Sequence, residues 1–258
     1  MVVRRIRDHV ATHNWFAVGV DFLIVVVGVF MATQADNWNE TLSKLADAAE
    51  SRREIIDDLQ GNETDFASRT AYYGAARTHA IAALKAIEHP NEPRGAAFLV
   101  DAYQASQVWM RPSVRTGYDE MTGAGLTHHV GNRETRLRLT SYYTNIRQFE
   151  VTALGQTGYR ERLRRVMPYG VQSAIKAQCP EQVTYLADGS QLASLPDNCV
   201  LDLDPAMIAT AVSRLQAANL GQDLTRHIAD IDQKLAGFER FARLARELRL
   251  QLESSERG

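Results

Sequence analysis

The chain has 258 residues, with 29 Lys and Arg residues against 31 Asp and Glu residues and a formal net charge of −2. This near balance argues against nucleic acid as a main partner, because a phosphate-binding surface normally shows a clear basic excess. Hydrophobic residues make up 45% of the chain, which is ordinary for a globular protein and leaves its chemistry open.

The most informative element is an apolar run near the N-terminus, from Trp15 to Ala35, which is broken only by Asp21. At about 1.5 Å of rise per residue, a helix of about 20 residues matches the ~30 Å hydrocarbon core of a bilayer. Arginines precede the run and acidic residues follow it, and basic flanks stay on the cytoplasmic side. We therefore predict a single-pass protein, with its segments in this order: a cytoplasmic tail at 1–14, a transmembrane helix at 15–35 and an extracytoplasmic helical domain at 36–258.

A cleaved signal peptide is the alternative interpretation of the same run, with Thr33, Gln34 and Ala35 as the cleavage site. The apolar region of signal peptides extends over about 7–15 residues, which is shorter than this run, so a retained anchor is favoured. Both interpretations export the rest of the chain.

Asp21 is an ionisable residue at membrane depth, where such groups normally face protein or water. On a helix it shares one face with Gly28 and Ala32, whose small side chains let a second helix approach closely. The pattern predicts that Asp21, Gly28 and Ala32 form a transmembrane pairing face for another membrane protein or a second copy of the chain. Alternatively, Asp21 lies near enough to the interface to be partly hydrated.

Helical spacing continues beyond the anchor. Apolar residues recur every three or four positions from Leu42 to Phe66, and no proline occurs before Pro90. The membrane helix is therefore expected to continue outward as a stalk to about Ile87. A second helix is predicted over 96–109.

A short helix and a glycine-rich turn follow, and Asn132 then caps a long basic helix. This helix is expected to extend to about Lys176, with a break at Met167–Pro168 as an alternative.

Cys179 and Cys199 are the only cysteines in the chain. Two cysteines about 20 residues apart in an exported segment favour a structural disulfide over a redox pair or a metal site. We predict a disulfide-closed loop over 179–204, with a short hairpin around Asp188 and Gly189.

Asp204 and Pro205 are typical of a helix start, and a helix is predicted from there to about Asn219. The last helix, from Gln222 to about Glu253, has the clearest periodicity in the chain and resembles a coiled-coil seam. The predicted seam residues are Leu224, Ile228, Ile231, Leu235, Phe238, Ala242, Ala245, Leu248 and Leu252. A helix of this length could return alongside the stalk. The predicted fold class is all-α: one transmembrane helix that continues into a bundle with a long C-terminal helix.

Two patches resemble an uncharacterised bacterial family of proteins with a single N-terminal membrane anchor. The first patch carries Gly19, Asp21, Gln34, Asn37, Trp38 and Asn39, and the second carries Tyr118, Asp119, Glu120, Gly125, Leu137, Tyr142 and Tyr143. The chain departs from the family at Asp21, where a glutamate is usual, and at Thr127–Val130, where an apolar turn is usual. The resemblance implies the inner membrane of a bacterium, with the helical domain in the periplasm, and no activity.

The sequence contains no motif typical of a catalytic nucleophile, a phosphate-binding loop or a zinc site. His128 and His129 are the best candidates for a metal, but side chains of adjacent residues usually point apart. We therefore expect no catalytic site, no metal and no cofactor.

The basic helix after Asn132 is the one candidate for ligand binding, because arginines are interleaved with tyrosines along it. Guanidinium groups bind anions in a bidentate manner. The candidate residues for a ligand or partner are Tyr142, Tyr143, Arg160, Arg162, Arg164 and Arg165. The alternative is internal: the acidic disulfide loop lies across this helix and neutralises it.

The expected function is a membrane-anchored interaction or sensing module whose partners are the lipid bilayer and another membrane protein. The alternative is a structural tether or assembly factor of an envelope complex. A complex of fixed composition in a pulldown would favour the tether.

Overall fold

The computed structural model describes residues 15–89, 91–153, 155, 158–186 and 191–254, with side chains from residue 22 on. It divides into two compact units, residues 1–51 and 52–258, which we describe separately. Helix α2, Trp15–Glu88, is the first element in the chain and contributes residues to both units. The predicted tail at 1–14 lies outside the described residues.

In the first unit the described residues belong to α2. The apolar side chains from Phe22 to Met31 are exposed to solvent, and so are Gly28 and Ala32 of the predicted pairing face. The Asp21 side chain lies outside the described part. Within that part, no helix offers a stretch long and apolar enough to cross a membrane.

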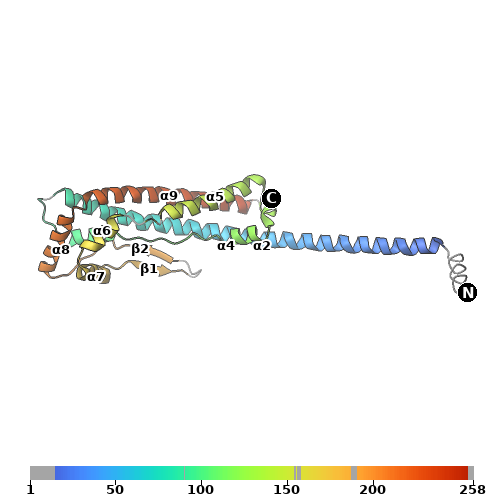
Figure 1. The fold of residues 1–258 in the computed structure, drawn as a ribbon, viewed down its shortest axis with the longest axis horizontal. Coiled ribbons are helices and arrows are strands. Elements are labelled where there is room, and N and C mark those ends of the chain that lie inside the picture. The colour runs from blue at the N-terminus through green and yellow to red at the C-terminus, as the bar shows by residue number, and fades with distance from the viewer. Residues whose placement is uncertain (1–14, 90, 154, 156–157, 187–190, 255–258) are drawn as a thin grey trace, which may run out of the picture. The chain divides into compact units, whose positions relative to one another are not determined.

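The second unit contains three long helical segments that lie side by side: α2 from Arg52 on, α5 (Arg133–Ala153) and α9 (Gly221–Ser254) (Figure 1). Helix α9 is antiparallel to α2, since Glu63 pairs with Arg246 at 2.6 Å and Arg77 pairs with Asp232 at 2.5 Å. The predicted return of the last helix alongside the stalk is therefore confirmed for the part of α2 in this unit.

The three segments pack through positions spaced alternately by four and three residues, as in a coiled coil. On α2 the buried positions are Ile55, Leu59, Asn62, Phe66, Arg69, Tyr73, Ala76, Ala80 and Ala83. On α5 they are Thr135, Leu139, Tyr142, Ile146, the partly buried Phe149 and Ala153. On α9 they are Leu224, His227, Ile231, Lys234, Phe238, Phe241, Ala245, Leu248 and Leu252.

Two details of the predicted seams are wrong. On α9 the fully buried positions include His227, Lys234 and Phe241, whereas Ile228, Leu235 and Ala242 are only partly buried. On α2 the apolar stripe passes through Ile56, but Ile55 is the buried residue and Ile56 is only partly buried. Leu42 and Leu45, also in this stripe, are about half exposed. On α9 the reason is that the polar residues His227 and Lys234 occupy buried positions, so an apolar stripe alone places the seam one residue off.

A second core cluster lies at the end of the bundle where α2 ends and α9 begins. Four shorter helices pack there: α3 (Ala96–Ala105), α6 (Gly158–Val166), α7 (Tyr169–Gln178) and α8 (Pro205–Ala218). The continuous basic helix expected from Asn132 to about Lys176 is wrong, because its residues form α5, α6 and α7, but the alternative with a break at Met167–Pro168 is confirmed. The break between α6 and α7 falls at Pro168, which lacks a backbone N–H and stands at the N-cap of α7.

Helix α4 (Thr116–Gly123) and the 3₁₀ helix η1 (Leu126–His129) lie between α3 and α5 in the chain. The predicted caps are confirmed. The Asn132 side chain accepts a hydrogen bond from Thr135 N at 2.9 Å, and Asp204 accepts one from Ala206 N at 2.7 Å.

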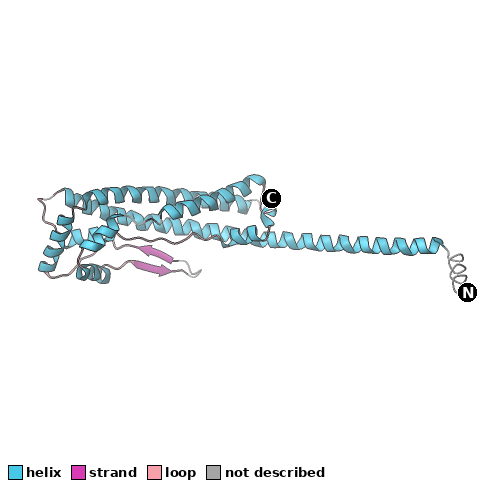
Figure 2. Ribbon diagram, viewed as in Figure 1, coloured by secondary structure: helices cyan, strands magenta, loops and turns pink. Residues whose placement is uncertain are grey.

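The predicted disulfide between Cys179 and Cys199 is confirmed. The loop that it closes carries an antiparallel hairpin of β1 (Gln182–Tyr185) and β2 (Gln191–Ser194), in which Gln182 pairs with Ser194 and Tyr185 with Gln191 (Figure 2). The fold is thus mostly helical rather than all-α. Ala193 and Leu195 of this region are buried in the first core cluster.

Candidate functional site

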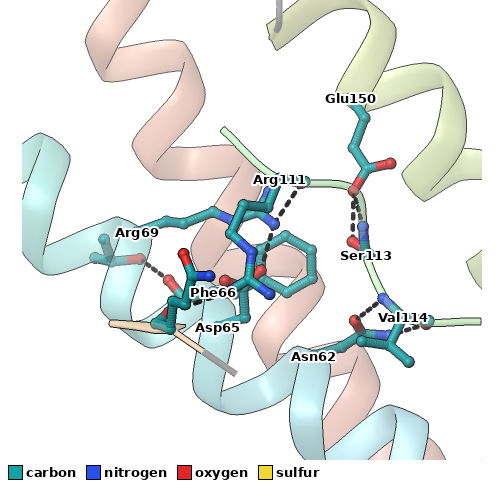
Figure 3. Close-up of polar contacts among 10 residues, drawn as sticks. Asn62, Asp65, Phe66, Arg69, Arg111, Ser113, Val114 and Glu150 are labelled. Atoms are coloured by element: carbon teal, nitrogen blue, oxygen red, sulfur yellow. Dashed lines mark hydrogen bonds and ion pairs between the residues drawn. The ribbon is translucent and has the colours of Figure 1, made fainter. Parts of the chain in front are cut away.

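An extended segment between α3 and α4, residues 106–115, runs across the first core cluster; we call it the strap. Side chains of α2 and α5 hold its backbone, as Figure 3 shows. Asn62 donates to Val114 O at 2.7 Å and accepts from Val114 N at 2.8 Å. Glu150 accepts from both the backbone N–H and the hydroxyl of Ser113, each at 2.6 Å. These contacts replace the backbone pairing that a strand would have.

Arg69 is the most deeply buried charged residue among those described, with no exposed surface. Its guanidinium pairs with Asp65 and donates to Arg111 O of the strap at 2.6 Å (Figure 3). The guanidinium carbon also lies 5.2 Å from the ring centroid of Phe66 and 5.8 Å from that of Phe238. Arg69 therefore joins α2, α9 and the strap.

His227, like Arg69, is a polar residue at a buried seam position, in this case on α9. Its Nε2 donates to Ala105 O at the end of α3 at 2.7 Å, and its ring stacks on Tyr159 with the centroids 5.1 Å apart. Burial lowers the pKa of His227, so the neutral ring is favoured. Tyr159 in turn donates to Ala102 O at 2.8 Å, and the pair fixes α3 against α6 and α9.

A cavity of about 280 Å³ lies where α5 ends, α6 begins and α9 passes. Phe149 and Ala153 form part of its apolar wall, and Arg226, Asp230 and Lys234 line it from one face of α9. Lys234 is 6% exposed, and its ammonium lies 5.3 Å from the ring centroid of Tyr73. Burial lowers the pKa of Lys234, and the negative charge of Asp230 opposes that shift.

The structure places the two tyrosines predicted to bind a ligand in the first core cluster. Tyr142 and Tyr143 are 2% and 1% exposed. Tyr142 packs edge-on against Phe241, and Tyr143 stacks on Tyr118 with the ring centroids 4.3 Å apart. Both rings therefore contribute to packing.

The four predicted arginines lie on α6. Arg160 donates to Ser106 O of the strap, and Arg162 pairs with Asp223. Arg164 stacks on Tyr103, with its guanidinium carbon 3.8 Å from the ring centroid. Arg165 is exposed.

These contacts are mainly with α3, the strap and the α8–α9 junction rather than with the acidic loop. From that loop, Glu181 lies near Arg160 and accepts a hydrogen bond from Tyr72 at 3.1 Å. The structure thus places three of the four arginines in internal contacts.

His128 and His129 lie on η1, and both side chains are exposed. In the described part of the chain, no group of three or more His, Cys, Asp or Glu side chains is placed to hold a metal ion.

Comparisons with protein-family models, with characterised proteins and with solved structures found no match. The resemblance of the anchor and of the Tyr118–Tyr143 patch to a bacterial family therefore stays a prediction.

Four of the polar residues at buried seam positions, Asn62, Arg69, His227 and Lys234, were not predicted from the sequence. A signal was present in the spacing: each lies three residues after one buried apolar residue and four residues before another, in register with the seam. A search for apolar residues alone passes over such positions.

Proposed function

We propose that this chain is a membrane-anchored interaction or sensing module. In this proposal the apolar run at the start of α2 lies in lipid, and the second unit is an exported helical domain that binds a ligand or partner. The supporting observation is the surface of α2 from Phe22 to Met31, where the large apolar side chains are between 45% and 71% exposed.

A helix that is apolar all round is normally buried in a large core or in a bilayer. Each Å² of apolar surface left in water costs about 25 cal/mol, so this segment favours a covering environment. Trp38, which is 71% exposed, follows the apolar run at a place where indole rings commonly meet the membrane interface. Because the flanking charge bias places residues after the anchor outside, we propose an extracytoplasmic location for the domain.

The membrane location is tested by fractionation of the full chain after an alkaline wash, which strips peripheral proteins. We expect the unaltered chain to stay in the membrane pellet. The double substitution Val26→Arg and Phe30→Arg should release it, because an arginine in mid-bilayer costs about 2.5–3.5 kcal/mol on insertion scales.

The matched control places the same charges at exposed apolar positions of the second unit, Leu137→Arg and Val151→Arg, which should leave the chain in the pellet. If the unaltered chain is released by the wash, the anchor is refuted. The proposed orientation is tested by a C-terminal reporter that is active only outside the cytoplasm; activity confined to the cytoplasm would refute it.

A further inference from the structure

We propose that the cavity at Lys234 binds a small organic monocarboxylate, whose carboxylate pairs with the buried ammonium and whose apolar body lies against Phe149. This inference rests on the proposed binding role of the domain and not on its membrane location, so the two are tested separately.

Five buried seam positions of the described bundle carry polar residues: Asn62, Arg69, Thr135, His227 and Lys234. In the described part of the bundle, four of the five have hydrogen-bond partners. Asn62 binds Val114, Arg69 binds Asp65 and Arg111, Thr135 binds Asn132 and Gln251, and His227 binds Ala105. For Lys234, no hydrogen bond or ion pair with a described residue is formed; its ammonium lies over the face of Tyr73, and the charge of Asp230 acts on it only through space.

A charged group in a protein interior is costly unless it is paired. Hydrogen bonds within the fold offset the free-energy cost of burying the other four polar seam residues. The ammonium of Lys234 instead faces a cavity. Structural packing alone would favour an apolar residue at this position, as at Phe238 one turn further along α9. An ammonium that faces a cavity and has no hydrogen-bond or ion-pair partner among the described residues points to an anionic occupant.

The charges around the cavity favour a monoanion over a dianion. Arg226, Asp230 and Lys234 are spaced by four residues and lie on one face of α9. Two cations and one carboxylate leave an excess of one positive charge, which a monoanion neutralises. A dianion would leave an excess negative charge in a partly closed site.

The size and lining of the cavity favour an organic occupant over an inorganic one. A cavity of about 150 Å³ is large enough to hold benzene. The volume of about 280 Å³ thus has room for a ring or short chain with a carboxylate. Phe149 and Ala153 provide an apolar surface for that body, while Lys234 provides the charge. An inorganic anion would leave the apolar wall without a partner.

The test is calorimetric titration of the full chain in a nonionic detergent, with benzoate and hexanoate as probes. We expect saturable binding of at least one of them, with one ligand per chain. Benzyl alcohol, which has the shape of benzoate without its charge, and inorganic phosphate should bind at least about tenfold more weakly, since a hydrogen bond to a charged group is worth about 1.5–3 kcal/mol.

Lys234→Met retains the volume of the side chain and removes its charge, so the affinity for the carboxylate should fall at least about tenfold. The control is Lys176→Met, at an exposed lysine on α7, which should leave the affinity unchanged. Arg226→Gln changes an exposed position, so it provides a second variant that should fold; its affinity should also fall.

The proposal is overturned if neither carboxylate binds saturably, if benzyl alcohol binds as tightly as benzoate, or if Lys234→Met binds like the unaltered chain. None of these titrations depends on the membrane fractionation. A negative titration therefore does not refute the membrane anchor, and release of the chain from the membrane does not refute the carboxylate site.

Discussion

At the scale of single residues, Asp58 shows how a buried carboxyl fixes one helix against another. Its Oδ2 accepts a hydrogen bond from Gly117 N at 2.8 Å, which attaches the start of α4 to α2. Burial raises the pKa of Asp58 to about 6, although hydrogen bonds from the backbone of α4 act in the opposite direction.

This pKa makes stability depend on pH. The folded protein holds the proton more tightly than the unfolded chain, so the stabilising contribution is fully present below the unfolded pKa of 3.8 and is lost as pH rises through about 6. Asp58→Asn keeps an acceptor for Gly117 and removes the titration. We compare the free energy of unfolding of the unaltered chain with that of this variant. The difference should rise by about 1–2 kcal/mol in favour of the unaltered chain from pH 7.5 to pH 4, and this energy is already reduced for solvent screening.

Urea unfolding of both chains at a series of pH values measures this difference. Asp197→Asn, at an exposed position of the disulfide-closed loop, is the control and should leave the pH profile of the unaltered chain in place. A parallel pH dependence for the unaltered chain and Asp58→Asn would contradict the assignment.

Gly117 illustrates close approach of two backbones. A Cβ built at this position would lie 2.6 Å from Glu54 Cβ and 2.7 Å from Ile55 N, and backbone atoms in a helix do not yield easily. We expect Gly117→Ala to lower the free energy of unfolding by about 1–3 kcal/mol, the usual cost of overpacking.

The control for this prediction is Gly74→Ala, in the interior of α2, where a Cβ would have no neighbour within 4 Å. It should stabilise the protein by about 0.5–1 kcal/mol, because alanine favours a helix over glycine. Chemical denaturation of the two variants measures both effects, and equal effects of the same sign would refute the packing argument.

At the scale of elements, the arginines of α6 attach this helix to its neighbours. Arg162 donates to Ala218 O at 2.7 Å, besides pairing with Asp223, and so bridges α6 to the α8–α9 junction. Arg164 covers the ring of Tyr103 on α3. We expect Arg164→Gln to lower the melting temperature more than Arg165→Gln, because it removes a cation–π contact worth about 0.5–2 kcal/mol.

Differential scanning calorimetry of these single variants, together with Arg162→Gln, measures the order of their effects. Arg165, exposed on the same helix, is the matched control. If Arg165→Gln is the most destabilising of the three, the internal role of α6 is wrong.

At the scale of the whole second unit, the disulfide connects the end of α7 to the segment before α8. Cys179 is 2% exposed and belongs to the second core cluster. In the chain-entropy account, closing a loop of about 20 residues stabilises the fold by about 3 kcal/mol. We expect the double substitution Cys179→Ser and Cys199→Ser to lower the free energy of unfolding by about 2–4 kcal/mol.

Urea unfolding with and without a reductant measures this contribution. The reductant should destabilise the unaltered chain and leave the serine variant unchanged, since the chain has no other cysteine. A midpoint that does not respond to the reductant in the unaltered chain would contradict the prediction.

Several elements of this unit were predictable because local signals define them. Asn132 and Asp204 cap helices through their own side chains, and the proline after Asp204 strengthens the second start. Strands β1 and β2 pair on either side of the predicted turn at Asp188 and Gly189, and the two turn residues themselves lie outside the described part of the chain. The division of the basic helix was harder to predict, because the balance between helix continuation and a turn near Gly155 depends on packing.

The candidate site was not predictable from apolar patterns. Lys234 is four residues after Asp230 and three after Ile231, a spacing that by itself fits a solvated helix face as well as a buried seam. Only the position of α5 and α6 against α9 encloses it.

By itself, the sequence determined most of the helices, the caps at Asn132 and Asp204, the disulfide and the apolar run, because these depend on neighbouring residues and on chain composition. Only the tertiary structure decided which face of each helix is buried, that Arg69 and His227 find partners in distant segments, and that Lys234 faces a cavity. The physical reason is that burying a polar residue costs free energy unless a hydrogen-bond or ion-pair partner lies against it. That partner comes from a segment elsewhere in the chain, which local sequence does not reveal.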